Sequence, residues 1–311
     1  MMNHLGRPLN RFSKGSYLHN HYQLYLFLLP ALVYILIFQY WPIYGVQIAF
    51  KDFKPGLGIE GSPWVGLKHF DMFFNSYFFG EILGNTLKLS LLTLLFGFPI
   101  PILLALLLNQ LPNQRYKRLV QTITYAPYFI STVVLCGMLY VFLSVRTGIF
   151  NHVIVLLGGR AINFIGDPRY FRTIYVASGV WQMSGFNAII YLAALAGISP
   201  ELHEAAVVDG ATKLQRVIHI DIPSIMPTIV MLLILNTGSL MSIGFEKAFL
   251  LQSNFNVAVS EIISTYVYKA GIEQMRYSFA SAVDLVNSVV NMTLLLTVNA
   301  ISRKVSGSSL W

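Results

Sequence analysis

A polar stretch between two long apolar segments carries the most ordered pattern of side chains in this chain. An acidic residue and two alanines come first, a glycine follows after three residues, an isoleucine after nine more, and a proline closes the pattern. These residues are Glu204, Ala205, Ala206, Gly210, Ile220 and Pro223. A polar segment between two membrane spans is where a membrane protein can touch a soluble partner.

The start of this stretch predicts a helix that a partner can approach closely. Ser199 can cap the free amides, Pro200 fits the first helical position, and Glu201 suits the positive end of the helix dipole. Ala205 and Ala206 then leave a low surface. The alternative is a surface helix that rests on lipid headgroups.

The end of this helix is predicted at Gly210, because glycine permits a φ above zero. A second piece, 211–220, is basic and amphipathic and runs toward Pro223. The proline is expected to mark the turn into the next span.

A second group of polar residues lies inside apolar segments. Trp181, Gln182 and Asn187 share one segment, and Asn236 and Ser239 lie three apart in the next, on one helical face. Sugars require amides for hydrogen bonds and aromatic faces for stacking. We therefore predict a sugar path here; the alternative is that these groups hold helices together.

Further polar residues lie in or near the apolar segments, and of these Asp284 is predicted to serve structure. Asp284, Asn287 and Asn291 share one face of the last apolar segment, and Glu246 and Lys88 are other charges in or near spans. A relay through Asp284, Glu246 and Lys88 would serve a transporter driven by an ion gradient. This is the alternative function, although no internal repeat accompanies it.

Enzymatic chemistry finds no support in the sequence. No Gly-Lys dipeptide occurs, so a Walker A loop is absent and the chain cannot hydrolyse ATP by that route. Ser184 comes near a G-x-S-G serine motif, but Gln182 takes the place of its first glycine. The histidines form no metal pattern, and the single Cys136 excludes a disulfide within the chain and a cysteine-based metal site.

The composition is that of a membrane protein. The 311 residues are 55% hydrophobic and 11% charged, against about 25% charged residues in soluble domains. The apolar residues fall in blocks, so their solvent is lipid. The net charge of +8 lies at the flanks of these blocks and suits anionic headgroups better than nucleic acid. The first apolar block exceeds a signal-peptide core and is predicted to be a permanent span.

The apolar blocks predict an all-α, polytopic fold with six transmembrane helices. Pro99 and Pro101 are expected to kink the second helix. The outer connections, about 49–83, 146–173 and 246–278, contain glycine turns and an interfacial aromatic stretch. The predicted spans are 22–48, 84–108, 121–145, 174–196, 224–245 and 279–301.

An even number of spans places both termini on one side of the membrane. Lys and Arg are equally numerous on the two sides, so the raw count decides nothing. The cluster Arg115–Arg118 and the basic N-terminal tail favour cytoplasmic termini, because short basic segments and the first helix dominate orientation.

The polar pattern resembles the EAA loop of the membrane subunits of bacterial ABC importers that use a binding protein. Ile222 stands where leucine is more usual, which conserves volume. Leu-Pro-Ala at 29–31, Lys-Asp-Phe at 51–53 and Trp-Val-Gly-Leu at 64–67 are similar to the carbohydrate-importer permeases. The likeness is greatest to the branch that serves complex oligosaccharides.

This resemblance implies a type I ABC importer permease of the bacterial cell membrane that translocates a sugar, and the expected sugar is an oligosaccharide. It implies one permease domain over 1–311, with a cytoplasmic tail at about 1–21 and a coupling loop at about 198–223. The implied partners are a second permease, two cytoplasmic ATPase subunits that bind ATP and Mg, and an extracytoplasmic solute-binding protein.

The resemblance also implies roles for the residues of the loop. The EAA segment would form a coupling helix that docks in a cleft of the ATPase, with Glu204 paired to a basic residue there. Gly210 would form the turn after that helix. The coupling residues are Glu204, Ala205, Ala206, Asp209, Gly210, Ile220 and Pro223.

Overall fold

The structure is a computed structural model that describes residues 22–306. The predicted cytoplasmic tail with Arg7, Arg11 and Lys14 lies outside the described residues.

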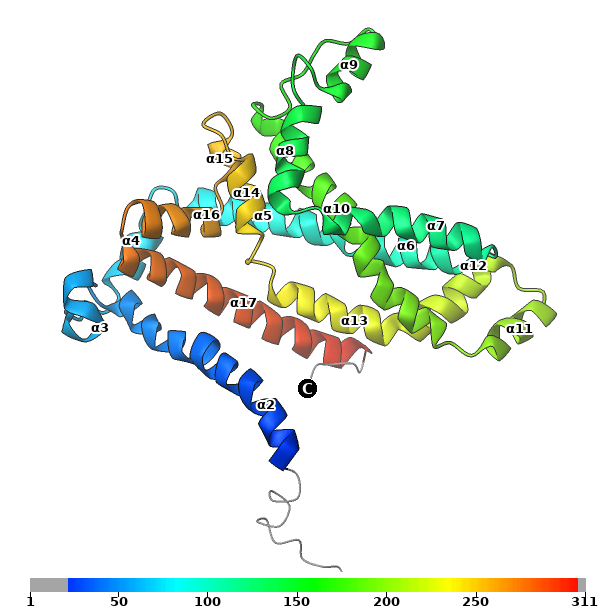
Figure 1. Cartoon of the computed structure of the whole chain (residues 1–311), viewed down its shortest axis with the longest axis horizontal. Coiled ribbons are helices and arrows are strands. Elements are labelled where there is room, and N and C mark those ends of the chain that lie inside the picture. The colour runs from blue at the N-terminus through cyan, green and yellow to red at the C-terminus, as the bar shows by residue number, and fades with distance from the viewer. Residues whose placement is uncertain (1–21, 307–311) are drawn as a thin grey trace, which may run out of the picture.

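Long apolar helices form the frame of the molecule, as the sequence predicts (Figure 1). Five are long and apolar enough to cross a membrane, and a bent pair of helices would make a sixth span. The long helices are Tyr22–Phe50, Phe79–Asn109, Pro168–Ala196, Lys213–Gly238 and Tyr277–Lys304.

Several of these helices consist of successive segments. The segments are α2 (Tyr22–Ile35), η1 (Leu36–Tyr40), η2 (Trp41–Phe50), α5 (Phe79–Gly97), α6 (Pro99–Asn109), α10 (Pro168–Ala196), α12 (Lys213–Arg216), η5 (Val217–Asp221), α13 (Ile222–Gly238) and α17 (Tyr277–Ser306). Shorter helices connect them: η3 (Pro55–Leu57), α3 (Gly58–Gly61), α4 (Lys68–Phe74), α7 (Gln114–Tyr125), η4 (Ala126–Phe129), α8 (Thr132–Phe142), α9 (Ile149–Leu156), α11 (Pro200–Val208), α14 (Phe245–Leu251), α15 (Val257–Ser260), α16 (Ile263–Tyr268) and η6 (Lys269–Glu273).

The second long helix is interrupted where the two prolines predict a kink. α5 ends at Gly97, Phe98 forms the junction, and Pro99 occupies the first turn of α6. The amide of Phe98 still donates to the carbonyl of Leu94 at 3.0 Å, so the helical hydrogen bonds continue up to this junction, where Pro99 and Pro101 have no N–H to donate.

The third predicted span, 121–145, is wrong as a single helix. The chain bends by 100° between Gln114–Phe129 and Thr132–Phe142. Pro127 lies in the last turn before the bend, and Ile130 is extended. Ser131 then accepts a hydrogen bond from Val134 N and starts α8. Hydropathy reports an apolar block but not a helix restart within it.

The fifth predicted span, 224–245, is wrong at both ends. The helix begins at Lys213, and Pro223 lies inside this continuous run and marks no turn. The helix ends at Gly238, and residues 239–244 are not helical. We call 239–244 the break; α14 follows it.

Side chains from three other helices satisfy the backbone of the break. Ser90 of α5 donates to the carbonyl of Leu240. Oδ1 of Asn291 in α17 accepts a hydrogen bond from Met241 N at 2.8 Å. The hydroxyl of Tyr175 in α10 donates to the carbonyl of Gly244 at 3.3 Å. Irregular backbone between membrane-spanning helices requires such partners, because lipid offers none.

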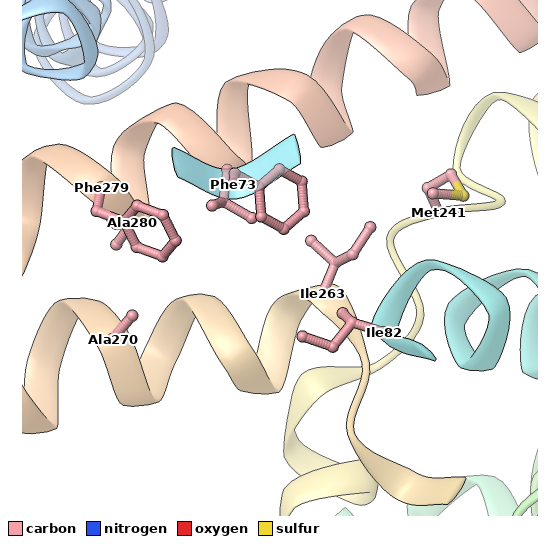
Figure 2. Packing of buried hydrophobic residues seen from close by; sticks show 8 residues of the cluster. Phe73, Ile82, Met241, Ile263, Ala270, Phe279 and Ala280 are labelled. Atoms are coloured by element: carbon pink, nitrogen blue, oxygen red, sulfur yellow. The ribbon is translucent and has the colours of Figure 1, made fainter. Parts of the chain in front are cut away.

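Clusters of buried side chains hold the break against the helices. Figure 2 shows one in which Met241 packs with residues of α4, α5, α16 and α17. Its members include Phe73, Ile82, Ile263 and Phe279. A second cluster joins α5, α10 and α14, and a third joins α6, α10 and α13. The helix α10 therefore packs against both halves of the frame.

Candidate functional site

The helix α11 forms where the sequence predicts the coupling helix. Pro200 and Glu201 occupy its first turn, as expected. The predicted cap by the Ser199 hydroxyl is wrong, because this side chain makes no capping hydrogen bond. The carbonyl of Ser199 instead accepts from Leu202 N at 3.2 Å.

The predicted end of α11 at Gly210 is confirmed. Gly210 has a φ of +81°. Its amide donates to Val207 O at 3.0 Å, and the amide of Ala211 donates to Ala206 O at 2.8 Å. This pair of bonds is a Schellman motif, which places a residue with positive φ just after the helix. A capping box of Thr212 and Gln215 then starts α12.

The surface of α11 is open to a partner. None of its residues is buried, and Figure 1 shows it at one end of the molecule, beyond α12. Glu204 and Ala205 are exposed, Ala206 is half-buried, and Val208 is 87% exposed. An exposed helix with this much apolar surface is typical of a contact surface, either for a protein partner or for lipid headgroups.

A single polar contact of His203 joins α11 to the frame. Its Nε2 lies 3.3 Å from Oδ1 of Asp221, whose side chain is fully buried in η5. Oδ2 of Asp221 accepts from Nε2 of Gln110 at 3.0 Å. We call these three residues the tether, because they join α11 to the end of the long helix Phe79–Asn109 and to the long helix Lys213–Gly238.

Sequence reasoning missed the tether. The signal was present: Asp221 is a carboxylate flanked by isoleucines at the edge of an apolar run. A buried carboxylate requires a partner, but the partner residue is set by how α11 folds back. Ile220 is half-buried and Pro223 is exposed on the continuous helix.

A polar cavity of about 420 Å³ lies between α5, α10, α13 and the break. Four of the five residues predicted for the sugar path line it: Gln182, Asn187, Asn236 and Ser239. Trp181 does not, since it faces an apolar pocket beside α8 and α9. Successive helical residues point about 100° apart, so Trp181 and Gln182 face different neighbours.

The polar side chains of the cavity differ in the number of hydrogen bonds that they make within the protein. The amide of Gln182 donates to the carbonyl of Ile130 at 2.7 Å. The amide of Asn236 donates to the carbonyl of Leu232, one turn earlier in the same helix, at 2.7 Å. Ser239 Oγ donates to Asn236 O at 3.2 Å. Within residues 22–306, the amide of Asn187 has no hydrogen-bond partner.

Two charged residues also line this cavity. Glu246 and Lys247 of α14 reach it because the chain turns at the break. Lys247 was assigned to an outer connection by the sequence, which carries no sign of this turn. Lys88 is exposed on α5, and Asp284 lines a different groove, so neither joins Glu246 at the cavity wall.

A bundle of apolar helices around a polar cavity, with an exposed helix at one end, defines a membrane permease. A family model described as "Binding-protein-dependent transport system inner membrane component" matches residues 97–307. The chain belongs to this family. It is a multi-pass inner membrane protein and the permease of an importer, not its ATPase.

The relatives of this chain include a named permease of a carbohydrate transport system. Protein LplB of Bacillus subtilis is 45% identical over 281 residues, which cover 90% of this chain and 88% of the relative. The polygalacturonan/rhamnogalacturonan transport system permease protein YteP of the same organism is 44% identical, with the same coverage. The chain is thus the permease of an ABC importer for oligo- or polysaccharides. The alternative function, a transporter driven by an ion gradient, is therefore wrong.

Solved structures share the fold. A chain of a bacterial ABC transporter that imports the acidic polysaccharide alginate is 40% identical, with a TM-score of 0.87. The alignment covers 94% of this chain and 99% of that one. A chain of the same kind, in complex with an alginate pentasaccharide-bound periplasmic protein, is 39% identical with a TM-score of 0.88 over 96% and 99%.

Proposed function

We propose that this chain works in a complex with a second permease, two cytoplasmic ATPase subunits and an extracytoplasmic binding protein. ATP and Mg bind to the ATPase subunits. The observation that carries the proposal is the exposure of α11 together with its attachment to the helices around the polar cavity.

In this proposal α11 is the coupling helix. It connects directly to α10 at one end and, through the turn at Gly210, to α12 and α13 at the other. Both α10 and α13 line the cavity. A displacement of α11 by the ATPase therefore moves two walls of the cavity together, and the tether transmits the same displacement to α6.

The residues of the loop have distinct parts in this coupling. The exposed carboxylate of Glu204 pairs with a basic residue of the ATPase, while Ala205 and Ala206 let the partner surface approach closely. Asp209 and Gly210 form the end of the helix. Ile220 and Pro223 belong to the helix that receives the movement.

The test uses the assembled complex in proteoliposomes. Glu204→Ala and Gly210→Val are expected to lower sugar uptake, and the ATPase activity stimulated by loaded binding protein, by about tenfold or more, because a paired charge or the helix end is lost. Assembly should persist in part. Glu201→Ala, in the first turn of the same helix, is the matched control. Full transport by the Gly210→Val complex would contradict the proposal.

The sugar path is proposed to run over Gln182, Asn187, Asn236 and Ser239. Their amides and hydroxyl can replace hydrogen bonds that a sugar makes to water. Trp181, predicted for this path as a stacking platform, faces the apolar pocket, and the proposal therefore depends on the four cavity residues.

The substrate is proposed to be an acidic oligosaccharide. The relatives named for polygalacturonan/rhamnogalacturonan and for the acidic polysaccharide alginate support this choice. Both termini are proposed to be cytoplasmic, on the same side as α11.

A further inference from the structure

Lys247 is a buried charge in the wall of the cavity. It lies in the first turn of α14, directly after the break, and only 8% of its surface is exposed. The same cavity holds Gln182 and Asn187 on the opposing helix α10. A lysine is rarely buried to this extent unless something pairs with it.

The partners of Lys247 within the chain are neutral. Its Nζ donates to the carbonyl of Tyr175 at 2.7 Å and lies 4.7 Å from the centre of the Tyr175 ring. The ion pairs of residues 22–306 are Arg169–Asp167, His203–Asp221 and Lys269–Glu261, and none includes Lys247. An ammonium has three donors, so two remain for other acceptors.

Gly179 lies directly beside this ammonium. A Cβ built on Gly179 would lie 3.1 Å from Nζ of Lys247. Gly179 itself lines the cavity. A side chain at position 179 would therefore crowd the ammonium at the wall of the cavity.

We infer that Lys247 binds a carboxylate of the substrate during its passage and selects for acidic sugars. The inference rests on the proposed function, since it places a uronic acid in the proposed sugar path. A carboxylate at this point would supply the counter-charge that residues 22–306 do not place at Lys247 and would accept hydrogen bonds from its free donors.

The neighbouring Glu246 has a complementary effect. It is exposed on the wall of the same cavity and can accept hydrogen bonds from sugar hydroxyls. It also repels a second carboxylate at its own position. The two residues together favour one orientation of an acidic unit, with its carboxylate at Lys247.

The experiment measures uptake by the full complex in proteoliposomes, with its binding protein outside and ATP inside. The probes are trigalacturonate and its methyl ester, which share a backbone and differ in charge. Lys247→Gln removes the charge and keeps a donor for the Tyr175 carbonyl, whereas Lys247→Arg keeps the charge. Because every variant receives each sugar from the same binding protein, each sugar is compared across variants.

Lys247→Gln is expected to lower trigalacturonate uptake by about tenfold or more, because a buried charge pair is lost, and to change ester uptake much less. Lys247→Arg should retain most of the acid uptake. Glu246→Gln, the matched variant in the same wall, should not lower the ratio of acid to ester uptake. Equal losses for both sugars in Lys247→Gln, or no loss for the acid, would overturn the inference.

A second measurement uses the wild-type complex and does not depend on how a variant folds. Reductive methylation of the Lys247 amine, followed by mass spectrometry, is expected to be slowed by trigalacturonate and not by the ester. Equal protection by both, or by neither, overturns the inference. Wild-type uptake of the ester as fast as the acid overturns only this inference, whereas absence of ATP-driven uptake of any saccharide would overturn the proposed function itself.

Discussion

Gly185 shows how closely single residues determine the packing around the cavity. A Cβ built on it would lie 1.9 Å from the carbonyl oxygen of Thr124, where α10 crosses α7. We expect Gly185→Ala to destabilise the permease by about 1–3 kcal/mol, the usual cost of overpacking. The measurement is the thermal stability of the complex in detergent. Gly137→Ala is the control, since a Cβ on Gly137 meets nothing within 4 Å, and an equal effect of both would contradict the packing argument.

The four cavity residues permit a second test on individual side chains. Alanine at Gln182, Asn187, Asn236 or Ser239 is expected to reduce sugar uptake in at least one variant, most at Asn187, whose amide is unengaged within the described residues. Loss of one hydrogen bond corresponds to about a threefold to tenfold change. Initial uptake rates at several sugar concentrations provide the measurement.

Thr173→Ala, on the face of α10 that lines the apolar pocket, is the matched control for this scan. Four silent variants would remove the sugar path from this cavity.

At the scale of the secondary-structure elements, the tether is the contact whose loss is expected to affect both the stability of the permease and its coupling to the ATPase. His203→Leu removes the imidazole beside the buried carboxyl group of Asp221 and leaves Gln110 as its hydrogen-bond donor; loss of one partner of a buried polar group costs about 1–3 kcal/mol. We expect this variant to lose stability and the coupling between ATPase activity and transport. Adding Asp221→Asn removes the charge and should recover part of the stability. Thermal unfolding and stimulated ATPase activity of both variants are the measurements.

His219→Leu is the control for this pair, because His219 is an exposed histidine of η5 whose Nδ1 lies 2.9 Å from the carbonyl oxygen of Gln215 and which forms no ion pair within residues 22–306. A double variant that is less stable than His203→Leu would show that the charge of Asp221 is not what the tether neutralises.

The elements also show why the long helices are interrupted where they are. The break exposes backbone groups, and Ser90, Tyr175 and Asn291 from three different helices bond to them. The same interruption turns α14 so that Lys247 meets the cavity. The irregular segment is thus stabilised where it lines the polar cavity. Membrane proteins tolerate non-helical backbone at such places, because the backbone is buried in protein or faces a cavity.

For the whole molecule, the orientation in the membrane can be tested with single cysteines. Cys136 is 3% exposed, so the native thiol gives little background in the folded protein. Val208→Cys lies on α11 and Tyr77→Cys on an outer connection, at positions 87% and 90% exposed. In intact cells a membrane-impermeant maleimide should label Tyr77→Cys and not Val208→Cys, and permeabilisation should make both reactive. Labelling of Val208→Cys in intact cells would contradict a cytoplasmic α11.

Much of the architecture could be predicted from hydropathy and motif spacing. Apolar blocks of sufficient length identify spans because each must cover the thickness of a bilayer with its own residues. The positions of α11 and of the turn at Gly210 could likewise be predicted from the sequence, because helix starts and positive φ values depend on local residue types. The two proline positions of the second helix belong to the same class of local signal.

Hydropathy and local motifs could not predict the bend before α8, the break after α13 or the tether. Each depends on residues that are distant in sequence, such as Asn291 for the break and Gln110 for Asp221. Local patterns therefore establish which segments enter the membrane and which one faces a partner. The gathering of Asn187, Asn236 and Lys247 around one cavity follows from helix packing and from hydrogen bonds between helices, which a one-dimensional pattern does not encode.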